Sequence, residues 1–117
     1  MFVKKNHKAA IKNKLKNGNT VIAPIKNNIC SYLIAGNKNT VGIRVPDHLF
    51  CKKLSKLFPH PITSTSVNRT GEKPLTKPDD ISNEFISDID LIIDDGIING
   101  VGSKIFLFEN GSWEQLR

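Results

Sequence analysis

The chain has 117 residues, of which 38% are hydrophobic and 24% are charged. This composition is typical of one globular domain, and no apolar run approaches the roughly 20 residues of a membrane-spanning helix, which argues against a membrane protein. The formal net charge of +6 is concentrated at one end: six of the 17 Lys and Arg residues lie within the first 16 positions, and the other 11 balance 11 Asp and Glu residues.

The N-terminal half of the sequence predicts helices that alternate with strands. Residues 5–16 have a weak apolar side and precede the turn signal Asn17-Gly18, so we expect a short helix there. Asp47 is a candidate N-cap for an amphipathic helix that ends before Pro59. The expected elements of this half are a strand at 20–25, a turn or short helix at 31–34, a strand at 40–45 and a helix at 48–58.

The C-terminal half predicts shorter elements and closes with a hairpin. We expect strands at 61–65 and 91–93, and a short helix that Asp79 or Asp80 caps and that ends near residue 85. The pair Asn110-Gly111 is a strong hairpin signal between residues 104–109 and 112–117. Together the two halves predict an α/β or α+β fold around one mixed sheet.

The cysteines and the N-terminus indicate the compartment. Cys30 and Cys51 form no Cys-x-x-Cys motif, so zinc-ribbon and thioredoxin interpretations lack their signature, and we predict no metal site and no structural disulfide. The first 16 residues contain Lys and Asn where a secretory signal needs an uninterrupted apolar segment. We therefore expect a cytoplasmic protein.

Residues 63–71 gather hydroxyls, an amide, a guanidinium and a glycine in one polar stretch. Backbone N–H groups and such side chains can bind phosphate oxygens, and Gly71 permits a left-handed turn. The same residue types also mark ordinary turns. The stretch is thus a candidate anion-binding loop, with a plain turn as the alternative.

Arg44 lies on an otherwise apolar predicted strand, where an unpaired charge would be costly. A guanidinium in such a position binds a carboxylate or phosphate, either of a ligand or of an internal Asp, and both alternatives remain open. His48 follows Asp47 at a helix start, where a helix-capping role is favoured over catalysis because no nucleophile pattern accompanies it. No Walker A, Gly-x-Gly-x-x-Gly or His-Glu-x-x-His motif occurs.

Two motifs in this order resemble those of the YrdC/Sua5 family of threonylcarbamoyl-AMP synthases. Residues 40–48 (TVGIRVPDH) are similar to the family's Thr-Val-Gly-x-Arg-x-Pro-x-His segment, and residues 66–71 (SVNRTG) to its Ser-x-Asn-x-Ser-Gly loop. Residues 90–96 (DLIIDDG) resemble a strand and turn of the family, and Gly102-Ser103 falls where its Ser-Thr-Val strand begins. The resemblance implies a basic segment at 1–17 and, at 18–117, the C-terminal half of a YrdC-like domain, a twisted mixed sheet with flanking helices that is shortened at its N-terminal side.

The resemblance also implies a function. The family condenses L-threonine, bicarbonate and ATP, with Mg²⁺, into threonylcarbamoyl-adenylate for the t6A modification of tRNA, a nucleotidyl transfer that releases pyrophosphate. Carried over position by position, the threonine ligands would be Arg44, Ser64 and Ser103. The nucleotide ligands would be Thr40, Ser66, Asn68 and Arg117.

The chain departs from the family before Arg44, where it contains no arginine and so lacks the family's Lys-x-Arg motif. An enzyme of this class would then be a fragment, a split protein that a partner chain completes with the N-terminal half of the site, or a reduced form. The alternatives are a non-catalytic YrdC-like module that binds nucleotide or double-stranded RNA, or a degenerate fragment. The lysine run favours tRNA or double-stranded RNA as a partner through Lys4, Lys5, Lys8 and Lys12, although a solvated helix face has the same composition.

Overall fold

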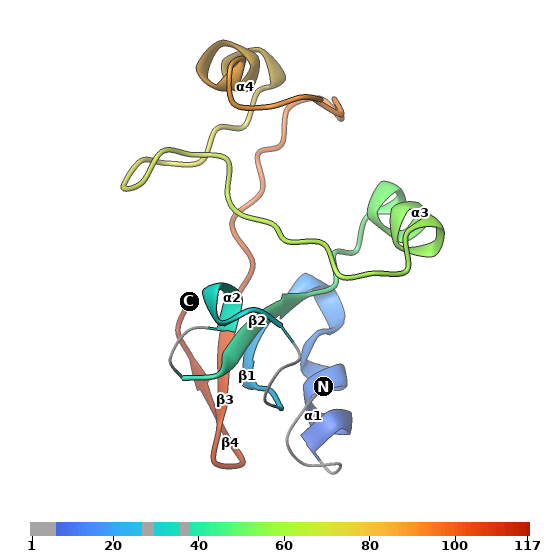
Figure 1. The fold of residues 1–117 in the computed structure, drawn as a ribbon, viewed down its shortest axis with the longest axis vertical. Coiled ribbons are helices and arrows are strands. Elements are labelled where there is room, and N and C mark those ends of the chain that lie inside the picture. The colour runs from blue at the N-terminus through green and yellow to red at the C-terminus, as the bar shows by residue number, and fades with distance from the viewer. Residues whose placement is uncertain (1–6, 27–29, 36–37) are drawn as a thin grey trace. The chain divides into compact units, whose positions relative to one another are not determined.

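A computed structural model describes residues 7–26, 30–35 and 38–117, and the chain divides into two compact units. The first unit comprises Met1–Pro59 together with Gly102–Arg117, and the second comprises His60–Val101. The first unit therefore joins two segments that are distant in the sequence. Figure 1 shows that these segments meet in one sheet.

The sheet of the first unit has four strands in the order β2-β1-β3-β4 (Figure 1). β1 (Thr20–Pro24) pairs antiparallel with β2 (Thr40–Arg44) and parallel with β3 (Ile105–Glu109). β4 (Ser112–Gln115) returns antiparallel to β3 after the Asn110-Gly111 turn. The predicted α+β fold with a mixed sheet and flanking helices is thus confirmed.

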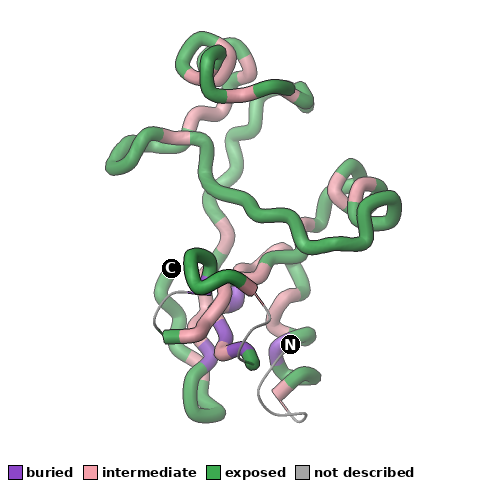
Figure 2. Tube along the Cα trace, in the orientation of Figure 1, coloured by how far each residue is buried: buried purple, intermediate pink, exposed green. Residues whose placement is uncertain are grey.

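One face of this sheet forms the core, and helix α1 (His7–Lys14) packs against β1 on that face. Burial alternates along β1, because successive side chains of a strand point to opposite faces. Figure 2 colours the buried residues of the trace purple. The core cluster consists of Ile11, Val21, Ala23 and Phe108, and the partly buried Leu15 and Trp113 pack against it. Among the described residues, Ile25 and Ala35 are also buried. Thr20, Arg44 and Thr40 lie on the other face of β1 and β2, together with Ile22 and Pro24.

The remaining helices of the first unit are η1, a 3₁₀ turn (Lys16–Gly18), α2 (Tyr32–Ala35) and α3 (Leu49–Leu57). They confirm the helix predicted at 48–58 and the short helix at 31–34.

The predicted Asp47 N-cap is wrong, because His48 occupies the N-cap position of α3 and no side chain caps it with a hydrogen bond. Lys52, one turn into the helix, instead pairs with the Asp47 carboxylate. Its hydrogen bond and charge lower the pKa of Asp47 below the ordinary value of 3.8. A charge-assisted contact has thus replaced the expected bond to a backbone amide.

The second unit contains helix α4 (Pro78–Phe85) and extended segments without strand pairing. The strands predicted at 61–65 and 91–93 are absent, because neither segment finds a neighbouring strand to share backbone hydrogen bonds. The helix begins with Pro78 at its first turn, and Lys77 holds the N-cap position without a capping side chain. Asp79 and Asp80 lie inside the first turn rather than capping it, where their charge favours the helix dipole.

Among the residues that the structure describes, no helix is long and apolar enough to cross a bilayer.

Candidate functional site

Arg44 is the last residue of β2 and lies directly opposite Thr20 of β1. Its Nε donates a hydrogen bond of 3.0 Å to the carbonyl oxygen of Gly18. Gly18 and Asn17 have positive φ angles of 71° and 64°, as the Asn-Gly turn signal predicts. Within residues 7–26, 30–35 and 38–117, Arg44 forms no ion pair, so the internal Asp considered from sequence is not its partner. The exposed guanidinium keeps other N–H donors for an anion.

Ser103 reaches the same end of the sheet from a distant part of the chain. Its Oγ lies 2.7 Å from Oγ1 of Thr20, and either hydroxyl can donate this bond. The backbone N–H of Thr20 donates to the carbonyl oxygen of Lys104 at 2.9 Å, which fixes the approach. Thr20 thus stands between Arg44 on one side and Ser103 on the other. Nothing in the sequence marked Thr20 as a site residue, because its contact depends on the parallel pairing of β1 with β3.

Arg117 also lies at this end of the sheet, just after β4. Its Nε donates to the carbonyl oxygen of Ser103 at 3.1 Å. The guanidinium rests against the backbone of Gly102, since a Cβ built on Gly102 would lie only 2.9 Å from Nη2 of Arg117. A larger residue at 102 would therefore displace the arginine tip. The end of the sheet where β1 begins thus brings together Arg44, Ser103 and Arg117.

Thr40 begins the strand that Arg44 ends. The two residues share a face of β2, because they are four positions apart, and their backbones are about 13 Å apart along the strand. Gly42 lies between them on that face, opposite Ile22, so no side chain of β2 separates Thr40 from Arg44. This face is the one opposite the core. A ligand longer than an amino acid would be needed to contact both Thr40 and Arg44.

A hollow of about 250 Å³ adjoins the turn that Arg44 holds. It is lined by Leu15, Lys16, Asn17, Gly18, Val45, Pro46, Asp47 and Lys52. Its volume is below the roughly 300 to 1,000 Å³ of pockets that enclose drug-sized ligands. The hollow thus suits a small ligand group.

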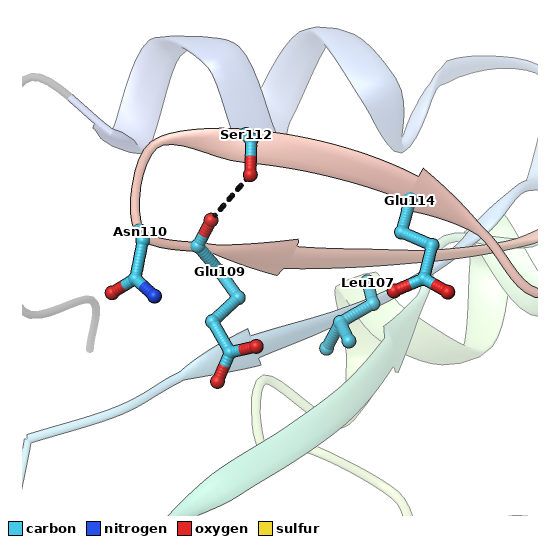
Figure 3. A pocket seen from close by; sticks show the side chains of 5 residues that line it. All are labelled: Leu107, Glu109, Asn110, Ser112 and Glu114. Carbon is cyan, nitrogen blue, oxygen red and sulfur yellow. Dashed lines mark hydrogen bonds between the residues drawn. The ribbon is translucent and has the colours of Figure 1, made fainter.

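A second, smaller hollow of about 90 Å³ lies on the β3–β4 hairpin (Figure 3). Its lining includes the carboxylates of Glu109 and Glu114, and Ser112 Oγ donates to the Glu109 carbonyl oxygen at 2.9 Å. Acidic groups repel phosphates, so this hollow is no candidate for the nucleotide. Residues 7–26, 30–35 and 38–117 contain no group of three or more His, Cys, Asp or Glu side chains suited to hold a metal ion.

The polar loop at 66–71 belongs to the second unit and forms a compact turn. Gly71 has a φ of 87°, which confirms the left-handed turn expected there. The Asn68 backbone N–H donates to the Ser66 carbonyl oxygen at 3.1 Å, and Asn68 Nδ2 donates to the Arg69 carbonyl oxygen at 2.8 Å. Asn68 Oδ1 is buried and has no hydrogen-bond partner. Ser64 and Ser66 are exposed.

The guanidinium of Arg69 is already paired with carboxylates of its own unit. It pairs with Glu84 and Asp88, and the hydrogen bonds to both carboxylates raise the pKa of Arg69 above its ordinary value. The second unit therefore presents the hydroxyls of Ser64 and Ser66 and the amide of Asn68, without a free cation from this loop.

The predicted site residues thus fall into two groups. Arg44, Ser103, Arg117 and Thr40 share the sheet of the first unit, and Ser64, Ser66 and Asn68 share the second unit. Lys8 and Lys12 are exposed on α1, whereas the other two lysines of the predicted RNA-binding set, Lys4 and Lys5, lie outside the described residues. Lys14 lies 4.0 Å from the centroid of the Phe106 ring and so faces the sheet.

Known proteins resemble the chain over nearly its whole length. The Sua5/YciO/YrdC family model, whose description reads "Telomere recombination", matches residues 2–117. The threonylcarbamoyl-AMP synthase of Idiomarina loihiensis is 28% identical over 96 residues, covering 74% of this chain and 51% of that protein. The threonylcarbamoyl-AMP synthase of Photobacterium profundum is 35% identical, over 64% of this chain and 40% of its own length.

Among solved structures, Pyrococcus abyssi Sua5 in complex with L-threonine superposes with a TM-score of 0.81 at 26% identity, covering 100% of this chain and 34% of that one. The chain therefore spans about half or less of the length of these relatives.

Proposed function

The chain belongs to the Sua5/YciO/YrdC family, and we propose that it binds L-threonine and ATP and contributes to the synthesis of threonylcarbamoyl-AMP. The observation that carries the proposal is the convergence of Arg44, Ser103 and Arg117 at one end of a single sheet. The similarity to synthases and to a threonine-bound Sua5 supports the choice of substrates.

In this proposal, the first unit binds threonine. Arg44 engages the carboxylate through its free N–H donors, since a guanidinium fork matches a carboxylate. Ser103, whose hydroxyl Thr20 holds in place, offers a polar contact beside it. The family resemblance also assigns Ser64, a residue of the second unit, to threonine.

The nucleotide set comprises Arg117, Thr40, Ser66 and Asn68, and ATP carries Mg²⁺ on its own phosphates. The amine of threonine adds to bicarbonate to give a carbamate with loss of water. The carbamate oxygen then attacks the α-phosphorus of ATP, and pyrophosphate leaves. Arg117 opposes the negative charge that builds on the phosphates, and catalysis of this kind depends mainly on positioning and electrostatics.

Few arginines are available to bind the phosphates of ATP. The sequence has three arginines, and Arg69 is already paired with two carboxylates. Arg44 and Arg117 remain, and the first is assigned to threonine. We therefore propose that the family's Lys-x-Arg motif, supplied from outside residues 1–117 by the same or another polypeptide, makes the remaining phosphate contacts, and that the product serves the t6A modification of tRNA.

Pyrophosphate release with threonine, bicarbonate and MgATP tests this proposal. We expect no turnover by the chain alone and turnover after mixing with the part of the Idiomarina loihiensis synthase that this chain does not match. Loss of one charge-assisted phosphate contact typically weakens binding about tenfold to a hundredfold, which explains the expected silence of the isolated chain.

The matched control is the same mixture with Arg44→Ala, which should be inactive. Robust turnover by the chain alone would contradict the need for a partner. A chain that binds neither threonine nor ATP, alone or mixed, would contradict the proposed function itself.

A second function, non-catalytic binding of double-stranded RNA or tRNA, is favoured by one observation: Lys8 and Lys12 are exposed on α1, one helical turn apart. Each phosphate contact adds about 0.7 to 0.9 to the slope of log affinity against log salt. Replacing both lysines with Gln should thus reduce that slope by about 1.5.

The control for this measurement is the pair Lys73→Gln and Lys77→Gln, which removes the same charge from exposed positions of the second unit. An equal change of slope in both double variants would show that only net charge matters. RNA binding through α1 would then be wrong.

A further inference from the structure

The side chain of Arg69 joins the polar loop of the second unit to the far end of α4. Nε lies 3.0 Å from Glu84 Oε1, and Nη2 lies 2.9 Å from Asp88 Oδ2. Nη2 also donates to the Glu84 carbonyl oxygen at 3.3 Å, and the guanidinium carbon lies 4.6 Å from the centroid of the Phe85 ring. One residue of the loop therefore makes four contacts with a segment 15 to 19 positions away.

This arrangement is stronger than an isolated surface ion pair. The three charged side chains are each about half exposed (50%, 46% and 48%), and a single pair in such a position contributes little. Here a planar fork engages two carboxylates and a carbonyl at once while its face rests on an aromatic ring. The combination fixes the direction of the arginine as well as its charge.

The backbone of Arg69 passes this constraint on to the candidate ligand groups. Its carbonyl oxygen accepts hydrogen bonds from Asn68 Nδ2 at 2.8 Å and from the Glu72 N–H at 3.0 Å. The amide orientation of Asn68 is thus set by the position of the Arg69 carbonyl. The other side of that amide, Oδ1, is buried without a partner. A buried acceptor of this kind is normally satisfied, so it is available to a donor that arrives with a ligand.

We infer that Arg69 is a positioning residue that clamps the loop at 66–71 onto α4 and thereby orients Ser66 and Asn68 for the nucleotide. The orientation of Ser66 and Asn68 for the nucleotide rests on the function proposed above, whereas the clamp itself does not. The competing explanation is that the loop holds its shape through its own backbone bonds, such as Leu75 N–H to the Val67 carbonyl at 2.8 Å. In that case the side chain of Arg69 would be dispensable.

The experiment compares amide hydrogen exchange and MgATP affinity in the full chain with Arg69→Gln and Arg69→Lys. In Arg69→Gln we expect the exchange of the Glu72 and Leu75 amides to rise about tenfold, because their hydrogen bonds open with the loop. MgATP affinity should fall several-fold. Arg69→Lys should restore only part of both, since an ammonium cannot make the fork.

Two controls show whether the effect is local. The amides of Thr20 and Ile105, which donate to carbonyls within the first unit, should exchange at unchanged rates. Lys77→Gln, an equal loss of charge at the start of α4, should leave the Glu72 and Leu75 amides unaffected. A charge swap, Arg69→Glu with Glu84→Arg, should recover part of the protection lost in Arg69→Glu alone.

The outcomes separate the clamp from the proposed function. Unchanged exchange of Glu72 and Leu75 in Arg69→Gln would overturn the clamp. Faster exchange with unchanged MgATP affinity would overturn the orienting role. Faster exchange in a chain that binds MgATP neither alone nor after mixing would overturn the proposed function and still support the clamp.

Discussion

Replacing Arg44 with alanine is expected to lower the affinity for L-threonine about a hundredfold, since a charge-assisted contact to a carboxylate contributes on the order of 2 to 3 kcal/mol. Arg44 is exposed at the end of β2, opposite Thr20 of β1, whose hydroxyl is hydrogen-bonded to that of Ser103. Within the described residues it spends one donor on the Gly18 carbonyl and pairs with no carboxylate. Titration calorimetry with threonine measures the effect directly.

The controls must separate ligand binding from the structural bond to Gly18. Arg44→Lys keeps the charge but loses the fork, so we expect an intermediate affinity. Thr20→Val removes the hydroxyl that holds Ser103 without changing any charge, and should weaken threonine binding only a few-fold. Equal affinity of Arg44→Ala and the unmodified chain would remove Arg44 from the threonine site.

Local signals in the sequence were sufficient to predict the individual strands of the first unit. Asn110-Gly111 predicted the hairpin, and both residues have positive φ angles (51° and 85°) with Glu109 paired opposite Ser112. The segments that form β1 and β2 were recognisable because β-branched side chains gather there. The placement of Arg44 at the end of a strand followed from the same pattern.

Long-range partners explain what the sequence did not reveal. Thr20 and Ser103 are 83 positions apart, and only the parallel pairing of β1 with β3 brings them together. Residues 61–65 and 91–93 have the composition of strands but no neighbour to pair with. Arg69 looked like an anion donor because its partners, Glu84 and Asp88, belong to a segment that the local pattern could not connect to it.

The similarity to the family also extends further than the motifs suggested. The YrdC-like domain was predicted to begin at residue 18, whereas the family model matches from residue 2. The lysine-rich segment that precedes β1 includes a helix whose only buried residue is Ile11, so its apolar signal is weak. The contribution of α1 to the core depends on packing against the sheet, which the local sequence does not show.

Replacing that residue, Ile11→Ala, is expected to reduce the free energy of unfolding by about 2 to 5 kcal/mol, because Ile11 is 1% exposed and is one of four buried side chains between α1 and the sheet. Small domains unfold at a cost of about 5 to 15 kcal/mol, so this loss is a large share of the total. Urea unfolding followed by the fluorescence of Trp113, which packs against the same cluster, measures it.

Lys12→Ala is the matched control, since Lys12 follows Ile11 in α1 but is exposed, and its replacement should change stability by no more than about 0.5 kcal/mol.

The comparison also bears on RNA binding, because Lys8 and Lys12 can form a fixed pair of phosphate contacts only while α1 is docked. A loss below about 1 kcal/mol in Ile11→Ala, less than a buried isoleucine ordinarily costs, would mean that α1 adds little to the core. The lysines would then belong to a loosely held segment, and RNA affinity should be insensitive to Ile11→Ala. If α1 is docked as the structure has it, the salt dependence of RNA binding and the stability of the sheet should decline together.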